Sequence, residues 1–157
     1  MEEITKSGVR ALVEAGDERA LLALFDEDPS RVRRYLTRLT RAADDACRAR
    51  AVVCFRTLSR ERSAHMPEFF LEIVRRSLWE MNEEGGNVAW SAPEVAGAVI
   101  AGSPVRYGGF FSYLFHAAVD EPSFQPSLLA AFELVSAADP SLTRPFEEQA
   151  RALREAL

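Results

Sequence analysis

The segment from Asp44 to Met81 reads DDACRARAVVCFRTLSRERSAHMPEFFLEIVRRSLWEM, and its apolar residues recur at the spacing of helices. In its second half, the residues that three- and four-residue spacing places on one helical face are Phe70, Ile73, Val74, Ser77, Leu78 and Met81. No part of the chain shows the alternation with a period of two that is typical of strands. The sequence therefore predicts an all-α fold.

Start and stop signals divide the chain into about eight or nine helices. The expected helices are Ile4–Ala15, Glu18–Asp26, Ser30–Thr40, Asp45–Arg62, Pro67–Met81, Ala92–Ala101, Val105–Val119, Phe124–Ala138 and Arg144–Leu157. Several links are short because a capping side chain is followed at once by proline, as in Asp28-Pro29 and Asp139-Pro140. Short links make consecutive helices antiparallel neighbours, so we expect stacked helical hairpins.

Length and composition indicate a globular protein. The 157 residues are 48% hydrophobic and 27% charged, which is typical of one packed domain, here expected to span residues 1–157. The first residues lack the basic and apolar regions of a signal peptide, and no apolar run approaches the ~18–20 residues that span a bilayer. We therefore expect a cytoplasmic protein with no membrane partner.

Charge is distributed unevenly along the chain. The net charge is −5, yet residues 29–62 hold ten arginines against Asp44, Asp45 and Glu61. Such a segment either forms a positive face for an anionic partner or is neutralised by acids of neighbouring helices. The second interpretation is favoured.

The cysteines and histidines give no signal for a cofactor or a metal. Cys47 and Cys54 are seven residues apart, which in a helix separates them by about 10 Å along the axis, too far for a disulfide. We expect both to be reduced thiols. His65 and His116 have no companion at the spacing of metal ligands. No cofactor is predicted.

A family resemblance emerges from two adjoining segments. Asp44–Met81 resembles a HEAT repeat, with an arginine-rich helix, a short turn and a second amphipathic helix. Trp79–Glu94, WEMNEEGGNVAWSAPE, resembles the signature W-x-x-N-E-E/D-S-G-G…W-x-A-P-E of a group of small prokaryotic HEAT-like proteins without an assigned activity, although the serine before the glycines is missing here. The resemblance covers roughly residues 44–102. It implies HEAT/armadillo-like antiparallel helical hairpins stacked as a short right-handed solenoid.

Local capping can explain the second half of this signature. Ser91 is placed to cap the helix that follows, and Glu94 at the third helical position would complete a capping box. Trp90, before the cap, could pack against Val95 as a hydrophobic staple. On this interpretation these residues need no ligand.

The first half of the signature is harder to explain by folding alone. Trp79 falls outside the expected core face, where it either packs on Arg75 or Arg76 or binds a partner. Glu83 and Glu84 are expected at a helix C-terminus, where the helix dipole disfavours negative charge. They form either a solvated turn or part of a site for a hard cation or for a partner's arginine.

The leading functional hypothesis is a non-catalytic helical-repeat module that binds a protein partner. Its expected contact residues are Trp79, Asn82, Glu83, Glu84, Trp90 and Glu94. One alternative is nucleic-acid binding through the arginines of residues 31–62, in the manner of HEAT-like DNA glycosylases, which the net charge of −5 disfavours. Another is a metal- or carboxylate-dependent enzyme at Glu83 and Glu84. No catalytic, cofactor-binding or metal-binding residue is assigned.

Overall fold

A computed structural model describes residues 3–82 and 90–157 of the chain. The described residues form helices and contain no strand, which confirms the all-α prediction. The helices are α1 (Lys6–Ala15), α2 (Glu18–Glu27), α3 (Pro29–Leu39), α4 (Asp45–Arg62), α5 (Pro67–Asn82), α6 (Ala92–Gly102), α7 (Pro104–Tyr107), α8 (Phe111–Ala118), α9 (Gln125–Ala138), α10 (Pro140–Thr143) and α11 (Glu147–Ala156), with 3₁₀ turns at Gly108–Phe110 and Arg144–Phe146.

Short polar side chains fix the starts of several helices. Asp17, Asp28 and Asp44 accept hydrogen bonds from backbone N–H groups in the first turns of α2, α3 and α4. Gly16 ends α1 in the left-handed region, at φ 69°, where its N–H reaches the carbonyls of Leu12 and Val13. These local contacts explain why most expected boundaries lie within two residues of the observed ones.

Two expected helices are interrupted in the structure. The predicted helix over residues 105–119 is broken by the 3₁₀ turn at Gly108, where a Cβ atom would lie 2.9 Å from a methyl carbon of Leu142. The predicted last helix begins earlier, at Pro140, and is interrupted at Pro145. Proline has no N–H to donate, which explains the second break.

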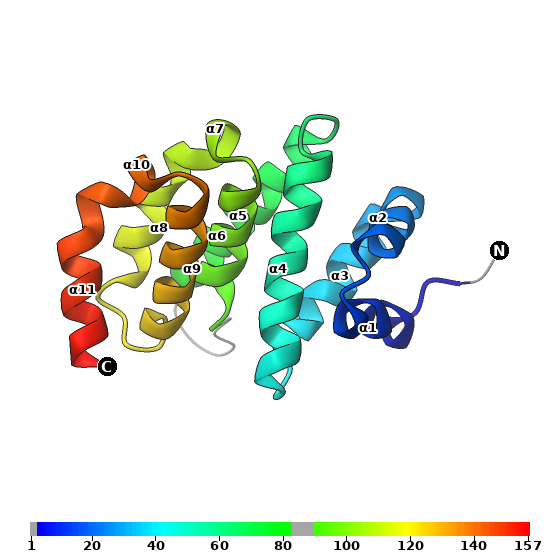
Figure 1. Cartoon of the computed structure of the whole chain (residues 1–157), viewed down its shortest axis with the longest axis horizontal. Coiled ribbons are helices and arrows are strands. Elements are labelled where there is room, and N and C mark those ends of the chain that lie inside the picture. Colours follow the sequence, from blue (N-terminus) through cyan, green and yellow to red (C-terminus); the bar gives the residue numbers. More distant parts are fainter. Residues whose placement is uncertain (1–2, 83–89) are drawn as a thin grey trace.

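Helix α6 lies at the centre of the fold, between α4, α5 and α9 (Figure 1). From Val95 to Ala101 all of its residues are buried. Two glycines allow close crossings: a Cβ on Gly97 would lie 2.6 Å from the Cβ of Ala131 in α9, and one on Gly102 would lie 2.5 Å from the carbonyl oxygen of Arg56 in α4. Small residues thus set the distances between the central helices.

Helices α1, α2 and α3 pack on one another and against α4 (Figure 1), and α2 and α3 also contact α5, through Phe25 on Phe70 and through the ion pair of Arg33 with Glu72. None of the helices in the two described ranges is long and apolar enough to cross a membrane.

Candidate functional site

Both tryptophans of the chain are unusually exposed. Trp79, near the end of α5, exposes 54% of its surface, and Trp90, just before α6, exposes 59%. The guanidinium carbon of Arg76 lies 5.3 Å from the centre of a Trp79 ring, which confirms the predicted packing on a neighbouring arginine. That contact leaves more than half of the indole in solvent.

A small ionic network lies next to Trp79. The Glu80 carboxylate accepts from Arg76 on its own helix and from Arg41 in the link between α3 and α4, each at 3.4 Å. Because Arg41 also lines the cleft that contains Trp90, the network extends from Arg76, which packs on Trp79, to that cleft. We call Arg41, Arg76, Trp79, Glu80 and Trp90 the tryptophan–arginine surface.

The cleft beside Trp90 has a volume of about 540 Å³. The link before α4, the first turns of α4 and the beginnings of α6 and α9 form its walls. Its lining residues are Thr40, Arg41, Asp45, Arg48, Ala49, Trp90, Ser91, Glu94, Ser123, Pro126 and Ser127. We call it the Trp90 cleft.

The predicted capping box at the start of α6 is wrong. Ser91 makes no side-chain cap, and its hydroxyl instead lies 3.4 Å from that of Thr40. The backbone N–H of Glu94 donates to the hydroxyl of Ser127 at 3.0 Å, so a residue of α9 caps α6. Trp90 is too exposed to be held mainly by a hydrophobic staple. A tertiary contact has replaced the local one because α6 and α9 pack closely.

This exchange of partners predicts a difference between two serine variants. Ser127→Ala removes the acceptor for the Glu94 N–H and is expected to lower the free energy of unfolding by about 0.5–2 kcal/mol, the usual range for losing an N-terminal cap. Ser91→Ala is expected to cost less, because it removes a longer contact between two hydroxyls. Urea denaturation of both variants measures the difference. A larger loss for Ser91→Ala would contradict the assignment.

Glu94 is a half-buried acid in the wall of the Trp90 cleft. Burial raises its pKa above the usual glutamate value, while the Ser127 hydroxyl and the charge of Arg48 act in the opposite direction with smaller effects. The desolvated carboxyl group therefore lies near Ser127 and Arg48 in the wall of a cleft, where it can contact a polar group of a ligand.

The remaining predicted contact residues divide into two groups. Asn82 is exposed, and its side-chain amide donates to the Leu78 carbonyl one turn earlier in α5, at 2.8 Å. This is a structural role. Glu83 and Glu84 lie outside the described residues, so the hypothesis of a site at these acids remains a prediction.

The arginines of residues 31–62 do not form one unpaired stripe. Arg33 pairs with Glu72 at 2.9 Å, and Arg62 holds the Asp26 carboxylate with two nitrogens at 2.7 and 2.9 Å. Further pairs link Arg31 to Glu3, Arg41 to Glu80, Arg48 to Asp45 and Arg60 to Glu18. Acids of neighbouring helices thus neutralise much of the segment, as the favoured interpretation of the charge pattern predicted.

The thiols and imidazoles do not combine into a reactive centre in the part of the chain that the structure describes. Cys47 and Cys54 are free thiols. Burial, with a smaller effect of the Glu18 charge, raises the pKa of Cys54 to about 12, so its thiol stays neutral. The His116 ring lies 2.8 Å from the Ser112 carbonyl oxygen and packs against Phe146. Among residues 3–82 and 90–157, no group of three metal-binding side chains is found.

Sequence reasoning missed Arg41, Glu80 and Ser127. Arg41 was one of ten arginines in its segment, and nothing local distinguishes the one that pairs with Glu80 and lines the Trp90 cleft. Ser127 caps a helix that begins far from it in the sequence. Its position in the first turn of an expected helix, near Pro126, indicated only a helix start.

Comparisons with known proteins give no relative for this chain: no protein-family model, no curated protein and no solved structure matches it.

Proposed function

We propose that this chain is a non-catalytic, HEAT-like helical-repeat module that binds a protein partner through the tryptophan–arginine surface and the adjoining Trp90 cleft. The observation that carries the proposal is the exposure of two tryptophans, 54% and 59%, with an ionic network that runs from Arg76, beside Trp79, to Arg41 in the wall of the Trp90 cleft. Tryptophan and arginine are the residues most enriched among those that dominate the energy of protein interfaces. Leaving such large apolar surfaces in solvent is costly unless a partner covers them.

The charges of this surface indicate the chemistry of the partner segment. Arg41 and Arg76 share a single carboxylate, that of Glu80, so the described residues leave the network with one excess positive charge. An apolar or aromatic side chain of the partner would lie against Trp90, and a carboxylate would approach Arg41. The half-buried Glu94 would accept a hydrogen bond from the partner's backbone or from a hydroxyl group.

The test is quantitative affinity capture with the immobilised chain, followed by titration of the recovered partner. Trp79→Ala and Trp90→Ala are each expected to weaken binding by about thirtyfold or more, the effect of losing a dominant interface residue. Both side chains are largely exposed, so folding should be unaffected, and circular dichroism checks this. Val105→Ala removes a side chain that is 99% exposed on α7 and is expected to bind like the wild type.

Equal recovery of the partner with wild type and with both tryptophan variants would contradict the proposal. So would capture that disappears after nuclease treatment, because it would point to nucleic acid as the bound species.

A further inference from the structure

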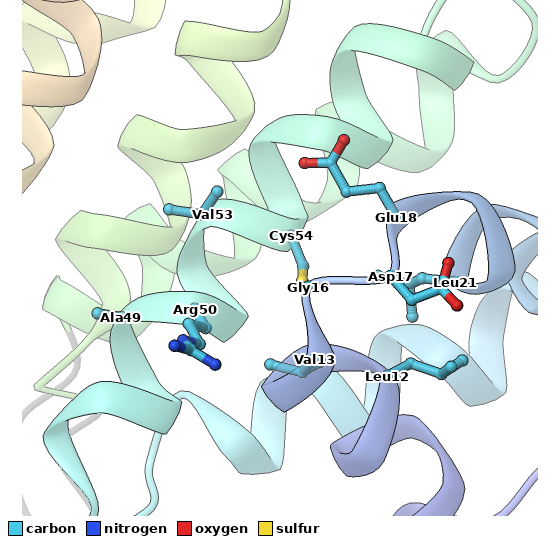
Figure 2. Close-up of a pocket in the computed structure, with 10 residues that line it drawn as sticks. All are labelled: Leu12, Val13, Gly16, Asp17, Glu18, Leu21, Ala49, Arg50, Val53 and Cys54. Atoms are coloured by element: carbon cyan, nitrogen blue, oxygen red, sulfur yellow. The ribbon is translucent and has the colours of Figure 1, made fainter.

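A second pocket is lined by neither tryptophan and shares only Ala49 with the lining of the Trp90 cleft. Helices α1, α2 and α4 enclose a volume of about 250 Å³, lined by Leu12, Val13, Gly16, Asp17, Glu18, Leu21, Ala49, Arg50, Val53 and Cys54 (Figure 2). We call it the α1–α2–α4 pocket.

The walls of this pocket are mostly aliphatic. Leu12 and Val13 come from α1, Leu21 from α2, and Val53 from α4. The Cys54 thiol is protonated and adds no charge. Apolar cavities of roughly 150 Å³ already bind benzene-sized molecules, so this volume suits a short aliphatic chain.

Gly16 keeps part of the pocket open. It takes φ 69° in the turn between α1 and α2, and a Cβ atom built on it would meet nothing within 4 Å. The left-handed conformation favours glycine, and because glycine has no side chain, the pocket space beside Gly16 stays empty.

Three charged side chains border the pocket, and two of them already have polar partners. The Asp17 carboxylate accepts from the Ala20 N–H as the cap of α2. Glu18 accepts from the Thr57 hydroxyl at 3.1 Å and lies 3.8 Å from Arg60. Each acid therefore already accepts a hydrogen bond from a residue that does not line the pocket.

Arg50 differs from these two acids. Its guanidinium donates to the backbone carbonyl of Glu14, near the end of α1, and it has no ion pair within the described residues. The Glu14 carboxylate is held by Arg10 at 2.9 Å. An arginine has five N–H donors, so several remain for a ligand. Figure 2 shows Arg50 and Glu18 at opposite ends of the pocket.

We propose that the α1–α2–α4 pocket binds a small aliphatic carboxylate, with its chain between Leu12, Leu21 and Val53 and its carboxylate on Arg50. The shape and apolar lining of the pocket favour an aliphatic chain in the ligand. Arg50, which has no carboxylate partner within the described residues, favours a ligand with an acidic group. The pocket contains none of the residues of the tryptophan–arginine surface and shares only Ala49 of α4 with the lining of the Trp90 cleft, so the two sites can be tested by separate substitutions.

The probes are octanoate and 1-octanol, which share the chain and differ in charge, titrated by calorimetry into the full chain. Octanoate is expected to bind more tightly than 1-octanol. Arg50→Gln is expected to weaken the binding of octanoate at least about tenfold and to change the affinity for 1-octanol by no more than about twofold. Arg75→Gln, an exposed arginine on α5, is the matched control and should bind octanoate like the wild type.

A second measurement locates the ligand in the unaltered protein. Octanoate is expected to shift the methyl resonances of Leu12, Val13 and Val53, and Val53→Phe, which fills the pocket, is expected to abolish binding. The proposal is overturned if octanoate does not bind at millimolar concentration, if Arg50→Gln weakens both probes equally, or if the shifted methyl groups lie elsewhere. If Val53→Phe does not fold, the methyl shifts of the wild-type protein still show where octanoate binds.

Discussion

Replacing Phe115 with alanine is expected to lower the free energy of unfolding by about 3–5 kcal/mol. The Phe115 side chain is 1% exposed in α8 and stacks on Phe146 with ring centres 4.5 Å apart. Phe111 and Phe132 complete the cluster, with ring centres 6.2 and 6.4 Å from that of Phe115. The variant loses the transfer energy of the ring and leaves a cavity that rigid helices on several sides can close only in part. Urea denaturation monitored by circular dichroism measures the loss.

The matched control for this prediction is Tyr113→Ala on the same helix. Tyr113 is 68% exposed, so its removal is expected to change the free energy of unfolding by no more than about 0.5 kcal/mol. Comparable losses in the two variants would mean that the orientation of α8 is wrong.

Gly102→Ala is expected to destabilise the protein by about 1–3 kcal/mol, although alanine is the better helix former. The new Cβ would lie 2.5 Å from the Arg56 carbonyl oxygen, 2.7 Å from the Ser59 Cβ and 2.9 Å from the Arg60 backbone nitrogen. Since two of these atoms belong to the α4 backbone, a side-chain rotation cannot relieve the clash. The helices must separate, which also strains the 2.8 Å hydrogen bond from the Ser59 hydroxyl to the Val99 carbonyl.

Gly109→Ala provides the control for a glycine without close neighbours. A Cβ at Gly109 would meet nothing within 4 Å, so this variant is expected to be unchanged or more stable by up to about 1 kcal/mol. Thermal unfolding of both variants compares them directly. A Gly102→Ala protein as stable as the wild type would contradict the close crossing of α4 and α6.

The proposed function and the second pocket are tested at different side chains, so their tests can be separated although α4 borders both. Loss of partner binding in the tryptophan variants with retained octanoate binding supports the protein-binding surface on its own. Arg50→Gln addresses the pocket without altering Arg41, Trp79 or Trp90.

The sequence by itself determined the class of fold and most helix boundaries. Helix α4 begins and ends at the expected residues, Asp45 and Arg62, because its signals are local: a capping Asp44 at one end and an apolar pattern of helical period throughout. The packing of Trp79 on a nearby arginine was also predictable, since Arg76 is three residues away on the same helix.

Tertiary structure alone decided how the candidate sites are built. Ser127 rather than Ser91 bonds the start of α6, Glu80 joins Arg41 to Arg76, and Arg50 borders an apolar pocket between three helices. Apart from the pair of Arg76 with Glu80, these contacts join residues far apart in the chain, and their distances depend on how closely helices cross, as at Gly97 and Gly102. Local sequence patterns act within about one helical turn. They fix where a helix starts and which face is apolar, whereas the partner of a polar side chain across a helix interface follows from packing.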